Sequence, residues 1–329
     1  MINFVYCFDE NYNFQAFSSM VSLLDKVSEK INIFAIHRIE EKLDFIPDTI
    51  TKHKNLNKIE IKKFQKNIHN YPNLFNSHVS EATYYRLFLE DYLSEDVEFF
   101  VYLDADIICV KDPIDSIKLS QDQLRDSNKA ISAKTEITNN TDVVADNEIF
   151  ERLGIKSNTY FNAGVLLVNY RLWFKEKPKE DFLKILNDKG ENLLFWDQDI
   201  LNIYFDGKYA ELDKRMNYVI DLATYIYTLL RKYKYKKILL EDVQNENFFV
   251  HYAGSHKPWS VDGVACNLSE FYHENFRKIN KNKYHLVHKR KRLSVLYFIK
   301  NIFNLNLFKI RHFFGFIRSF IASFFNFLN

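Results

Sequence analysis

The stretch Phe99-Phe100-Val101-Tyr102-Leu103-Asp104-Ala105-Asp106-Ile107-Ile108 decides the fold that this sequence predicts. Its first five residues are aromatic or aliphatic and predict a buried strand. Asp104 and Asp106 follow, and in an extended chain two residues with this spacing share a face. Two carboxylates on one face suit Mg²⁺ or Mn²⁺ carrying a phosphate, because both ions prefer oxygen ligands. The alternative is a solvated strand end before a turn at Asp112-Pro113.

The length and composition predict a sizeable globular core. The 329 residues allow one large α/β domain or two small ones, and 47% of them are hydrophobic. The cysteines at 7, 109 and 266 are widely separated and lack CxxC spacing, which favours reduced thiols in a cytoplasmic protein over a disulfide framework or a zinc site. The N-terminus lacks a basic region and reaches Asp9 too early for a signal peptide, so a strand is expected to begin there directly.

The charge is unevenly distributed along the chain. The formal net charge is +2, but residues 275–329 carry 12 basic residues and no Asp or Glu. The remaining 33 basic residues stand against all 43 acidic ones, so residues 1–274 have a net charge of −10. An acidic body with a basic tail indicates two tasks, one chemical and one directed at a polyanion.

The N-terminal segments predict a parallel sheet. Strands expected over 3–8 and 31–36 flank a helical pattern, and this βαβ order places ligands beyond the carboxyl ends of the strands. The sequence has neither a GxGxxG fingerprint nor a P-loop. Asp9, Asn11 and Tyr12 follow the first strand and could hold a base by hydrogen bonding and stacking. Their alternative is an ordinary polar turn.

Three further stretches carry candidate site residues. Arg86 lies on a helix expected over 81–93 and capped by Ser80; it is either a solvated surface charge or directed at a phosphate. Asn162-Ala163-Gly164 stands just ahead of a buried strand, where a glycine lets other groups approach the backbone closely. Trp196-Asp197-Gln198-Asp199 opens a helix running to Phe205, and acidic residues at a helix start also have a purely structural explanation.

The rest of the body is assigned from local patterns alone. The expected elements are a helix ending at 127, a strand over 130–133, a loop or lid over 135–158 with a short helix at 147–153, a helix over 171–186, and a tyrosine-rich helix over 222–233. No function is assigned to residues 213–249.

A second chemically dense stretch is His251-Tyr252-Ala253-Gly254-Ser255-His256-Lys257-Pro258-Trp259, which follows a short strand. A histidine at a strand end can be a metal ligand. Gly254 frees a backbone N–H for an anion, and Lys257 supplies a point charge for phosphate. Any of these residues alone would be unremarkable, but their combination within nine residues favours a site.

The tail predicts a membrane-surface helix. Residues 293–329 contain 10 phenylalanines interrupted by Lys300, Lys309, Arg311 and Arg318, so no apolar run reaches the ~18–20 residues that a spanning helix needs. Basic, aromatic and amphipathic segments are typical of helices lying in a membrane interface. The alternative is a helix packed on the body or on a partner subunit. Nucleic-acid binding is disfavoured because the acidic body would repel it.

Taken together, the motifs Tyr102-Leu103-Asp104-Ala105-Asp106, Phe161-Asn162-Ala163-Gly164, Trp196-Asp197-Gln198-Asp199 and the 251–259 stretch resemble glycosyltransferase family 8, particularly the bacterial lipopolysaccharide galactosyl- and glucosyltransferases. The resemblance implies a GT-A fold over residues 1–274, with a mixed, mostly parallel sheet flanked by helices, followed by the membrane-associating tail 275–329. It implies retaining transfer from a UDP-hexose with Mn²⁺ or Mg²⁺.

The resemblance also implies roles for individual residues. Asp104, Asp106 and His251 match the family's metal ligands. Gly254 and Lys257 match its diphosphate contacts, and Glu136 falls near the place of an acceptor-side aspartate. The uracil and ribose positions are Cys7, Asp9, Asn11 and Tyr12, and the positions around the donor sugar are Arg86, Asn162, Asp197 and Gln198.

Three functional hypotheses follow from these patterns. The first is an enzyme at the inner face of the cytoplasmic membrane, held there by residues 284–329, that adds galactose or glucose to a lipopolysaccharide, a lipooligosaccharide or another cell-surface glycan. With the amide of Gln198 on the reactive face, a same-face, SNi-like attack is expected. The second is a transferase acting on a protein or soluble acceptor, with a tail that serves oligomerisation. The third is a UDP-sugar-binding module without turnover.

Overall fold

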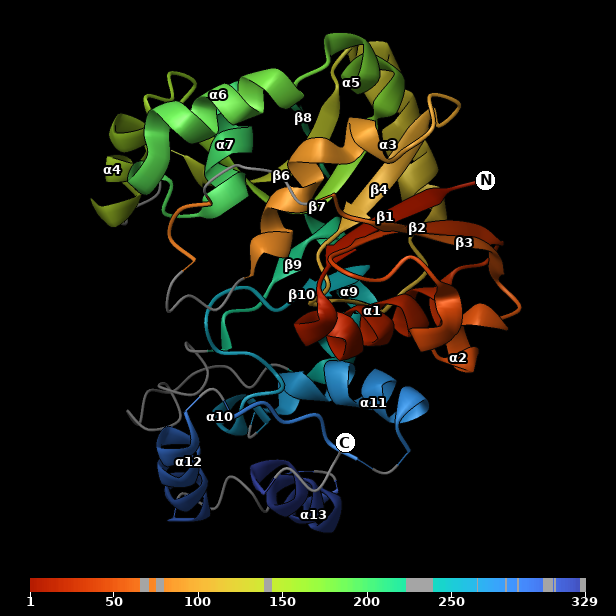
Figure 1. The fold of residues 1–329 in the computed structure, drawn as a ribbon, viewed down its shortest axis with the longest axis vertical. Coiled ribbons are helices and arrows are strands. Elements are labelled where there is room, and N and C mark those ends of the chain that lie inside the picture. Colours follow the sequence, from red (N-terminus) through yellow and green to blue (C-terminus); the bar gives the residue numbers. More distant parts are fainter. Residues whose placement is uncertain are drawn as a thin grey trace.

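The computed structural model describes residues 1–65, 71–74, 80–138, 144–222, 239–264, 266–281, 283–288, 290–303, 310 and 312–325. A seven-stranded sheet forms its centre, in the order β3-β2-β1-β4-β7-β6-β8 (Figure 1). β4 pairs parallel with β1 and antiparallel with β7, so the sheet is mixed and mostly parallel, as predicted. The strands are β1 (Asn3–Phe8), β2 (Ile31–His37), β3 (Leu56–Lys63), β4 (Phe99–Leu103), β6 (Ile131–Thr138), β7 (Thr159–Asn169) and β8 (Ala210–Glu211).

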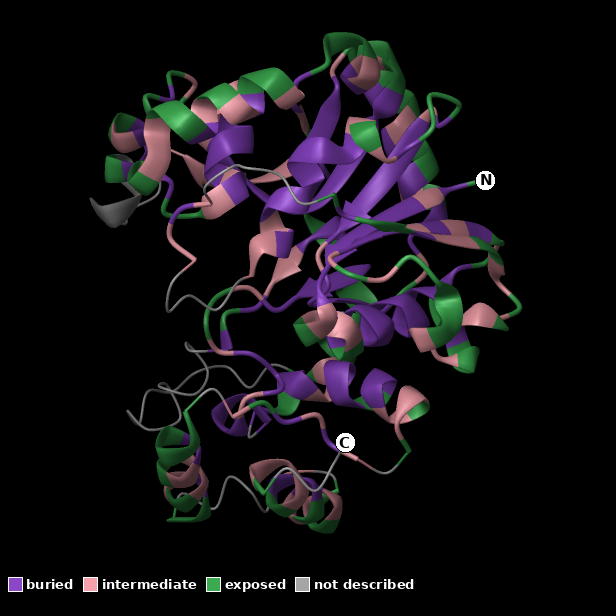
Figure 2. Ribbon diagram, in the orientation of Figure 1, coloured by how far each residue is buried: buried purple, intermediate pink, exposed green. Residues whose placement is uncertain are grey.

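Helices cover both faces of this sheet, and its central strands β1, β4 and β7 are almost entirely buried (Figure 2). Alternate residues of β4 serve the two cores: Phe99, Val101 and Leu103 pack with α1 (Asn13–Lys26) and α3 (Ile114–Ser127). Phe100 and Tyr102 pack on the other face. The helices on that face are η3 (Glu81–Asp91), α5 (Tyr170–Glu176), α6 (Lys179–Lys189) and α7 (Trp196–Phe205).

A second, three-stranded sheet lies beyond the end of β4. It has the order β5-β10-β9, with β5 (Ile107–Cys109) antiparallel to β10 (Phe249–His251) and β9 (Tyr218–Val219) parallel to it. Residues 104–106 join β4 to β5 as a turn closed by the Ile107 N–H donating to the Asp104 carbonyl at 3.2 Å. The predicted extended chain through Asp106 is therefore wrong, because the backbone turns there to enter the second sheet.

Several predicted boundaries are also corrected. The single helix expected over 171–186 is two helices, α5 and α6, because Lys177 adopts a left-handed φ of 49° and Pro178 follows it. Asn162-Ala163-Gly164 lies inside β7 rather than ahead of it. β6 is longer than the predicted strand, and α4 (Val144–Leu153) begins earlier than the predicted helix. Most of the tyrosine-rich helix predicted over 222–233 lies outside the described residues.

The remaining short elements of the body connect these layers. They are η1 (Glu10–Tyr12), η2 (Leu43–Phe45), α2 (Asp48–Thr51), η4 (Gly190–Asn192), η5 (Lys214–Met216), α9 (Leu240–Glu246), α10 (Val261–Val264) and η6 (Asn267–Ser269).

The C-terminal helices form a separate layer beneath the body (Figure 1). α11 (Glu270–Ile279) packs on α1 and runs across the predicted boundary at residue 274, with Phe276 buried in the body. α12 (Lys291–Phe303) and α13 (Phe313–Phe324) follow, and Phe316 and Phe320 pack against Val261 and Val264 of α10. Among the described residues, no helix is both long enough and apolar enough to cross a bilayer.

Candidate active site

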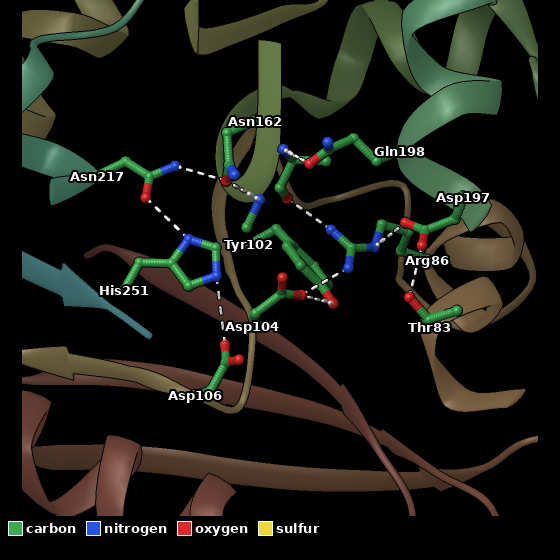
Figure 3. A network of polar contacts seen from close by, with 12 residues as sticks. Thr83, Arg86, Tyr102, Asp104, Asp106, Asn162, Asp197, Gln198, Asn217 and His251 are labelled. Carbon is green, nitrogen blue, oxygen red and sulfur yellow. Dashed lines mark hydrogen bonds and ion pairs between the residues drawn. The ribbon is translucent and has the colours of Figure 1, made fainter. Parts of the chain in front are cut away.

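Three potential ligand groups converge where the two sheets meet (Figure 3). Asp104 follows β4, Asp106 precedes β5, and His251 ends β10 opposite Ile107 of β5. One ligand atom from each side chain lies within 4.8 Å of the other two. The antiparallel pairing of β5 with β10 thus brings a distant histidine to the predicted pair of carboxylates.

The chemistry of this cluster fits a divalent cation. Asp106 is buried, and its Oδ2 accepts a 2.6 Å hydrogen bond from Lys257 Nζ. Its Oδ1 has no hydrogen-bond donor among the described residues and lies 3.5 Å from His251 Nε2. Burial is the largest single influence and would raise the pKa of Asp106, but the charge and hydrogen bond of Lys257 act together with His251 and the backbone to lower that pKa. An ionised, partly unpartnered carboxylate beside an imidazole matches the donors that Mn²⁺ accepts.

Arg86 is a buried link between the carboxylates. Its Nη2 donates to Asp104 Oδ1 at 2.6 Å, its Nη1 donates to the Ala163 carbonyl at 2.6 Å, and its Nε forms a 2.7 Å ion pair with Asp197 Oδ2. The guanidinium also stacks on the Tyr102 ring at 4.1 Å. Burial would lower the pKa of Arg86, but the two carboxylates raise it. Arg86 is therefore not the solvated surface charge that sequence reasoning left open.

Asp197 is held at the first turn of α7. Thr83 donates to its Oδ1 at 2.5 Å, opposite the Arg86 contact on Oδ2. Burial raises the pKa of Asp197 to about 6, although Arg86 and Thr83 both favour its ionised form. The preceding Trp196 has a φ of 52°, a left-handed conformation that is strained for a bulky residue.

The amides of Gln198 and Asn162 are both tied to β7. The Ala163 N–H donates to Gln198 Oε1 at 2.9 Å, and Gln198 Nε2 donates to Tyr160 Oη at 3.2 Å. Tyr160 in turn donates to the buried Asp199 at 2.6 Å. Asn162 Nδ2 donates to Glu136 at 3.0 Å, so Glu136 reaches the same region from β6.

Several of the predicted residues line one cavity. Its lining includes Cys7, Tyr12, Arg86, Asp104, Asp106 and Lys257. Asp197 and His251 are not part of this lining, but they contact Arg86 and Asp106, which are. Gln198 and Asn162 do not line the cavity either.

Three further predicted residues, Asp9, Asn11 and Gly254, also lie outside the cavity lining. Asp9 caps η1 by accepting from the Asn11 N–H at 3.0 Å, and Asn11 itself is exposed. Gly254 is exposed, with a left-handed φ of 78° that favours glycine.

Sequence reasoning missed four residues that shape the site. Tyr102 donates to Asp104 Oδ1 at 3.0 Å, and its position two residues before Asp104 could have revealed it. Thr83 contacts Asp197 and stands in no recognisable motif. Tyr160 contacts Asp199, and its place directly before Phe161-Asn162-Ala163-Gly164 could have revealed it. Asn217 lies 3.1 Å from His251 Nδ1 and comes from the region to which no function was assigned.

Comparisons with known proteins agree with this architecture. The family model described as "Glycosyl transferase family 8" matches residues 3–263. The chain is 29% identical over 263 residues to a lipopolysaccharide 1,2-glucosyltransferase of Escherichia coli, covering 76% of this chain and 71% of the relative. It is 32% identical over 201 residues to a lipopolysaccharide 1,3-galactosyltransferase of Salmonella typhimurium, covering 58% of this chain and 52% of that relative.

Solved structures share the fold. A crystal structure of the galactosyltransferase LgtC with donor and acceptor sugar analogues superposes with a TM-score of 0.66 at 20% identity, covering 89% of this chain and all of that one. The glycosyltransferase GlyE of Streptococcus pneumoniae superposes with a TM-score of 0.56 at 20% identity, covering 84% of this chain and 61% of that one. These likenesses show that the body has the GT-A fold predicted for it.

Proposed function

This chain belongs to glycosyltransferase family 8, a family of retaining hexosyltransferases, and we propose that it moves galactose or glucose from a UDP-sugar to a lipopolysaccharide, a lipooligosaccharide or another cell-surface glycan. The observation that carries the proposal is the convergence of Asp104, Asp106 and His251 at the end of β4, with Asp106 Oδ1 unpartnered among the described residues. The names of the relatives support the acceptor class.

In this proposal Asp104, Asp106 and His251 hold Mn²⁺ or Mg²⁺. The ion would neutralise charge on the departing diphosphate, so that no proton donor is needed to expel it. Lys257 and the backbone at Gly254 would bind the same diphosphate. The uracil and ribose would be bound by Cys7, Asp9, Asn11 and Tyr12.

The donor sugar would lie against Arg86, Asn162, Asp197 and Gln198. Gln198 presents an amide, and Asp197 is engaged by Arg86 and Thr83, so neither is arranged as a free carboxylate nucleophile. The anomeric carbon–phosphate oxygen bond would break with its electron pair leaving on UDP. The acceptor hydroxyl would then bond to the anomeric carbon from the same face and give its proton to the departing phosphate oxygen.

The tail is proposed to hold the enzyme on the inner face of the cytoplasmic membrane. On α13, Phe314, Arg318 and Ile321 are exposed along one side, while Phe316 and Phe320 pack inward. On α12, Leu293, Leu296, Ile299 and Phe303 are exposed at a similar spacing. Exposed apolar side chains beside basic ones suit an anionic membrane surface, where each cation contributes about 1 kcal/mol.

Catalysis is tested by the hydrolysis and transfer of a panel of UDP-hexoses with Mn²⁺ present or removed by EDTA. We expect Mn²⁺-dependent turnover of UDP-galactose or UDP-glucose that Asp104→Ala abolishes. Asp122→Ala is the matched control, because Asp122 is an exposed carboxylate on α3. A protein that binds UDP-sugar but turns over none with any acceptor tried would be the non-catalytic module instead.

The tail is tested by sedimentation with vesicles containing anionic phosphatidylglycerol. We expect the triple variant Phe314→Ser, Ile321→Ser and Phe325→Ser to lose vesicle binding while keeping donor hydrolysis. Leu119→Ser is the control, because Leu119 is an exposed apolar residue on α3. Equal vesicle binding by the triple variant and the control would refute the membrane role and favour a soluble acceptor.

A further inference from the structure

We infer that Asn217 is a positioning residue that holds His251 in the tautomer able to bind a metal ion. This inference rests on the proposed metal role of His251 and concerns a residue outside the cluster of ligands. It follows from a hydrogen-bonded chain that begins at the backbone of Gly164 and ends at the imidazole (Figure 3).

The direction of each bond in this chain is fixed by its first donor. The Gly164 N–H can only donate, and it lies 2.9 Å from Asn162 Oδ1. The amide of Asn162 is therefore oriented with its oxygen toward Gly164, and its Nδ2 faces the Glu136 carboxylate at 3.0 Å, an acceptor. Two independent neighbours thus agree on the orientation of Asn162.

The orientation of Asn162 in turn determines the orientation of Asn217 and the tautomer of His251. Asn162 Oδ1 accepts from Asn217 Nδ2 at 2.9 Å, so Asn217 Oδ1 is the atom that faces His251 Nδ1 at 3.1 Å. An amide oxygen can only accept, so Nδ1 carries the hydrogen. The lone pair of the neutral ring is then on Nε2, the atom directed at Asp106 Oδ1.

The burial of Asn217 and His251 makes the other tautomer of His251 unfavourable. Asn217 is fully buried, and His251 is only 5% exposed. In the other tautomer, the Nδ1 lone pair would face the Asn217 oxygen, and burial away from solvent strengthens that repulsion. The backbone of Asn217 is anchored by Lys134 Nζ, which donates to its carbonyl at 3.0 Å.

The imidazole also packs directly against Gly164 of β7. A Cβ at that position would overlap the ring and lie 2.8 Å from Nδ1. The imidazole therefore occupies the space that only a glycine at position 164 leaves open beside β7. Partners that orient a ligating histidine in this way typically contribute about ten- to hundred-fold to metal affinity.

Two substitutions separate positioning from packing. Asn217→Asp keeps an oxygen to accept from Nδ1, whereas Asn217→Leu has a similar size and keeps none. We expect the Mn²⁺ dissociation constant, measured by electron paramagnetic resonance of the free ion, to change less than about threefold in the Asp variant and to rise about ten- to hundred-fold in the Leu variant. Asn275→Leu, at a buried asparagine on α11, is the control and should bind Mn²⁺ normally.

If Asn217 had a purely structural role, Asn217→Asp would weaken Mn²⁺ binding more than Asn217→Leu, because a buried charge destabilises a fold more than leucine does. Equal Mn²⁺ affinity in Asn217→Leu and the unaltered protein would overturn the inference. Nitrogen-15 NMR of labelled histidine gives a readout that needs no variant to fold: we expect the hydrogen of neutral His251 on Nδ1, and finding it on Nε2 would overturn the inference as well. Asp106→Ala tests the metal site separately, since unchanged Mn²⁺ binding in that variant would refute the proposed function and leave the tautomer result intact.

Discussion

The contact between Lys257 and Asp106 allows a quantitative test of the site through stability. Lys257 Nζ lies 2.6 Å from Asp106 Oδ2 and 2.7 Å from the Tyr252 carbonyl, and the two side chains are only 9% and 11% exposed. Lys257→Met keeps the aliphatic stem but removes the charge, which leaves a buried carboxylate without its cation. Removing one partner of a buried ion pair costs about 3–5 kcal/mol, and we expect a loss of that size in EDTA.

The assay is urea unfolding at constant pH, with Lys52→Met as the matched control. Lys52 pairs with Asp48 at 2.8 Å, but those side chains are 73% and 75% exposed. An exposed pair contributes about 0–1 kcal/mol, so the same substitution there should change the free energy of unfolding by no more than that. If Lys257→Met is as mild as Lys52→Met, the lysine does not neutralise Asp106 and the reasoning about this site is refuted.

A second arm of the experiment adds Mn²⁺. In the unaltered protein the ion must share Asp106 with Lys257, whereas in Lys257→Met it has the carboxylate to itself. A tenfold gain in Mn²⁺ affinity would return about 1.4 kcal/mol of stability at a saturating concentration. Mn²⁺ should therefore stabilise the variant more than the unaltered protein, and equal stabilisation would show that the ion does not bind at Asp106.

Three other substitutions test separate parts of the site. Gly164→Ala should weaken Mn²⁺ binding at least about tenfold by displacing the His251 ring, and unchanged affinity in a binding titration would contradict this. Because burial raises the pKa of Asp197 to about 6, the native state keeps a proton that the unfolded chain releases near pH 4. Between pH 4 and pH 7 the unaltered protein should therefore lose up to about 3 kcal/mol of unfolding free energy that Asp197→Asn does not lose. If the difference in unfolding free energy between the two proteins is the same at both pH values, the raised pKa of Asp197 is contradicted. Tyr160→Phe removes the donor to Asp199 and the acceptor of Gln198, so we expect about 1–3 kcal/mol lower stability in urea unfolding and slower donor hydrolysis, and a variant as stable as the unaltered protein would contradict the role of this hydroxyl.

The sequence allowed the prediction of those parts of the fold that depend on local pattern. Five apolar residues before Asp104 identify β4, and the βαβ opening identifies the parallel half of the sheet. The split between α5 and α6 was missed, although Pro178 interrupts the helical pattern there and is a local signal. Local pattern can reveal both kinds of feature, because strand burial and helix breaking depend on neighbouring residues.

The supporting contacts of the site could not be predicted in this way. Asn217 meets His251 only because β9 and β10 pair, and two-residue β9 has no periodicity to detect. Arg86 resembles a surface residue in sequence, and its burial follows from the approach of Asp104 and Asp197 from two other elements. The motif residues were recognisable by type, but the partners that orient them depend on tertiary pairing.

A break in the pairing of β7 explains why so many site residues meet there. β6 pairs Ala133 with Leu166 but Lys134 with Asn162, so the ladder shifts past Ala163 and Gly164. On the other side, β4 ends with Leu103 opposite Val165. Neither neighbouring strand therefore uses the peptide groups of Ala163 and Gly164 in its ladder.

The peptide groups of Ala163 and Gly164 form hydrogen bonds with residues of the site instead. The N–H and carbonyl of Ala163 bind Gln198 and Arg86, and those of Gly164 bind the Asn162 side chain and the Asp104 N–H. Buried backbone groups must find partners, so the irregularity both requires these polar residues and orients them. A regular ladder between β6 and β7 would occupy the same groups and leave the buried Arg86 and Gln198 without their backbone partners. The irregular strand, more than any single side chain, therefore determines where the carboxylates, the amides and the imidazole of this site can lie.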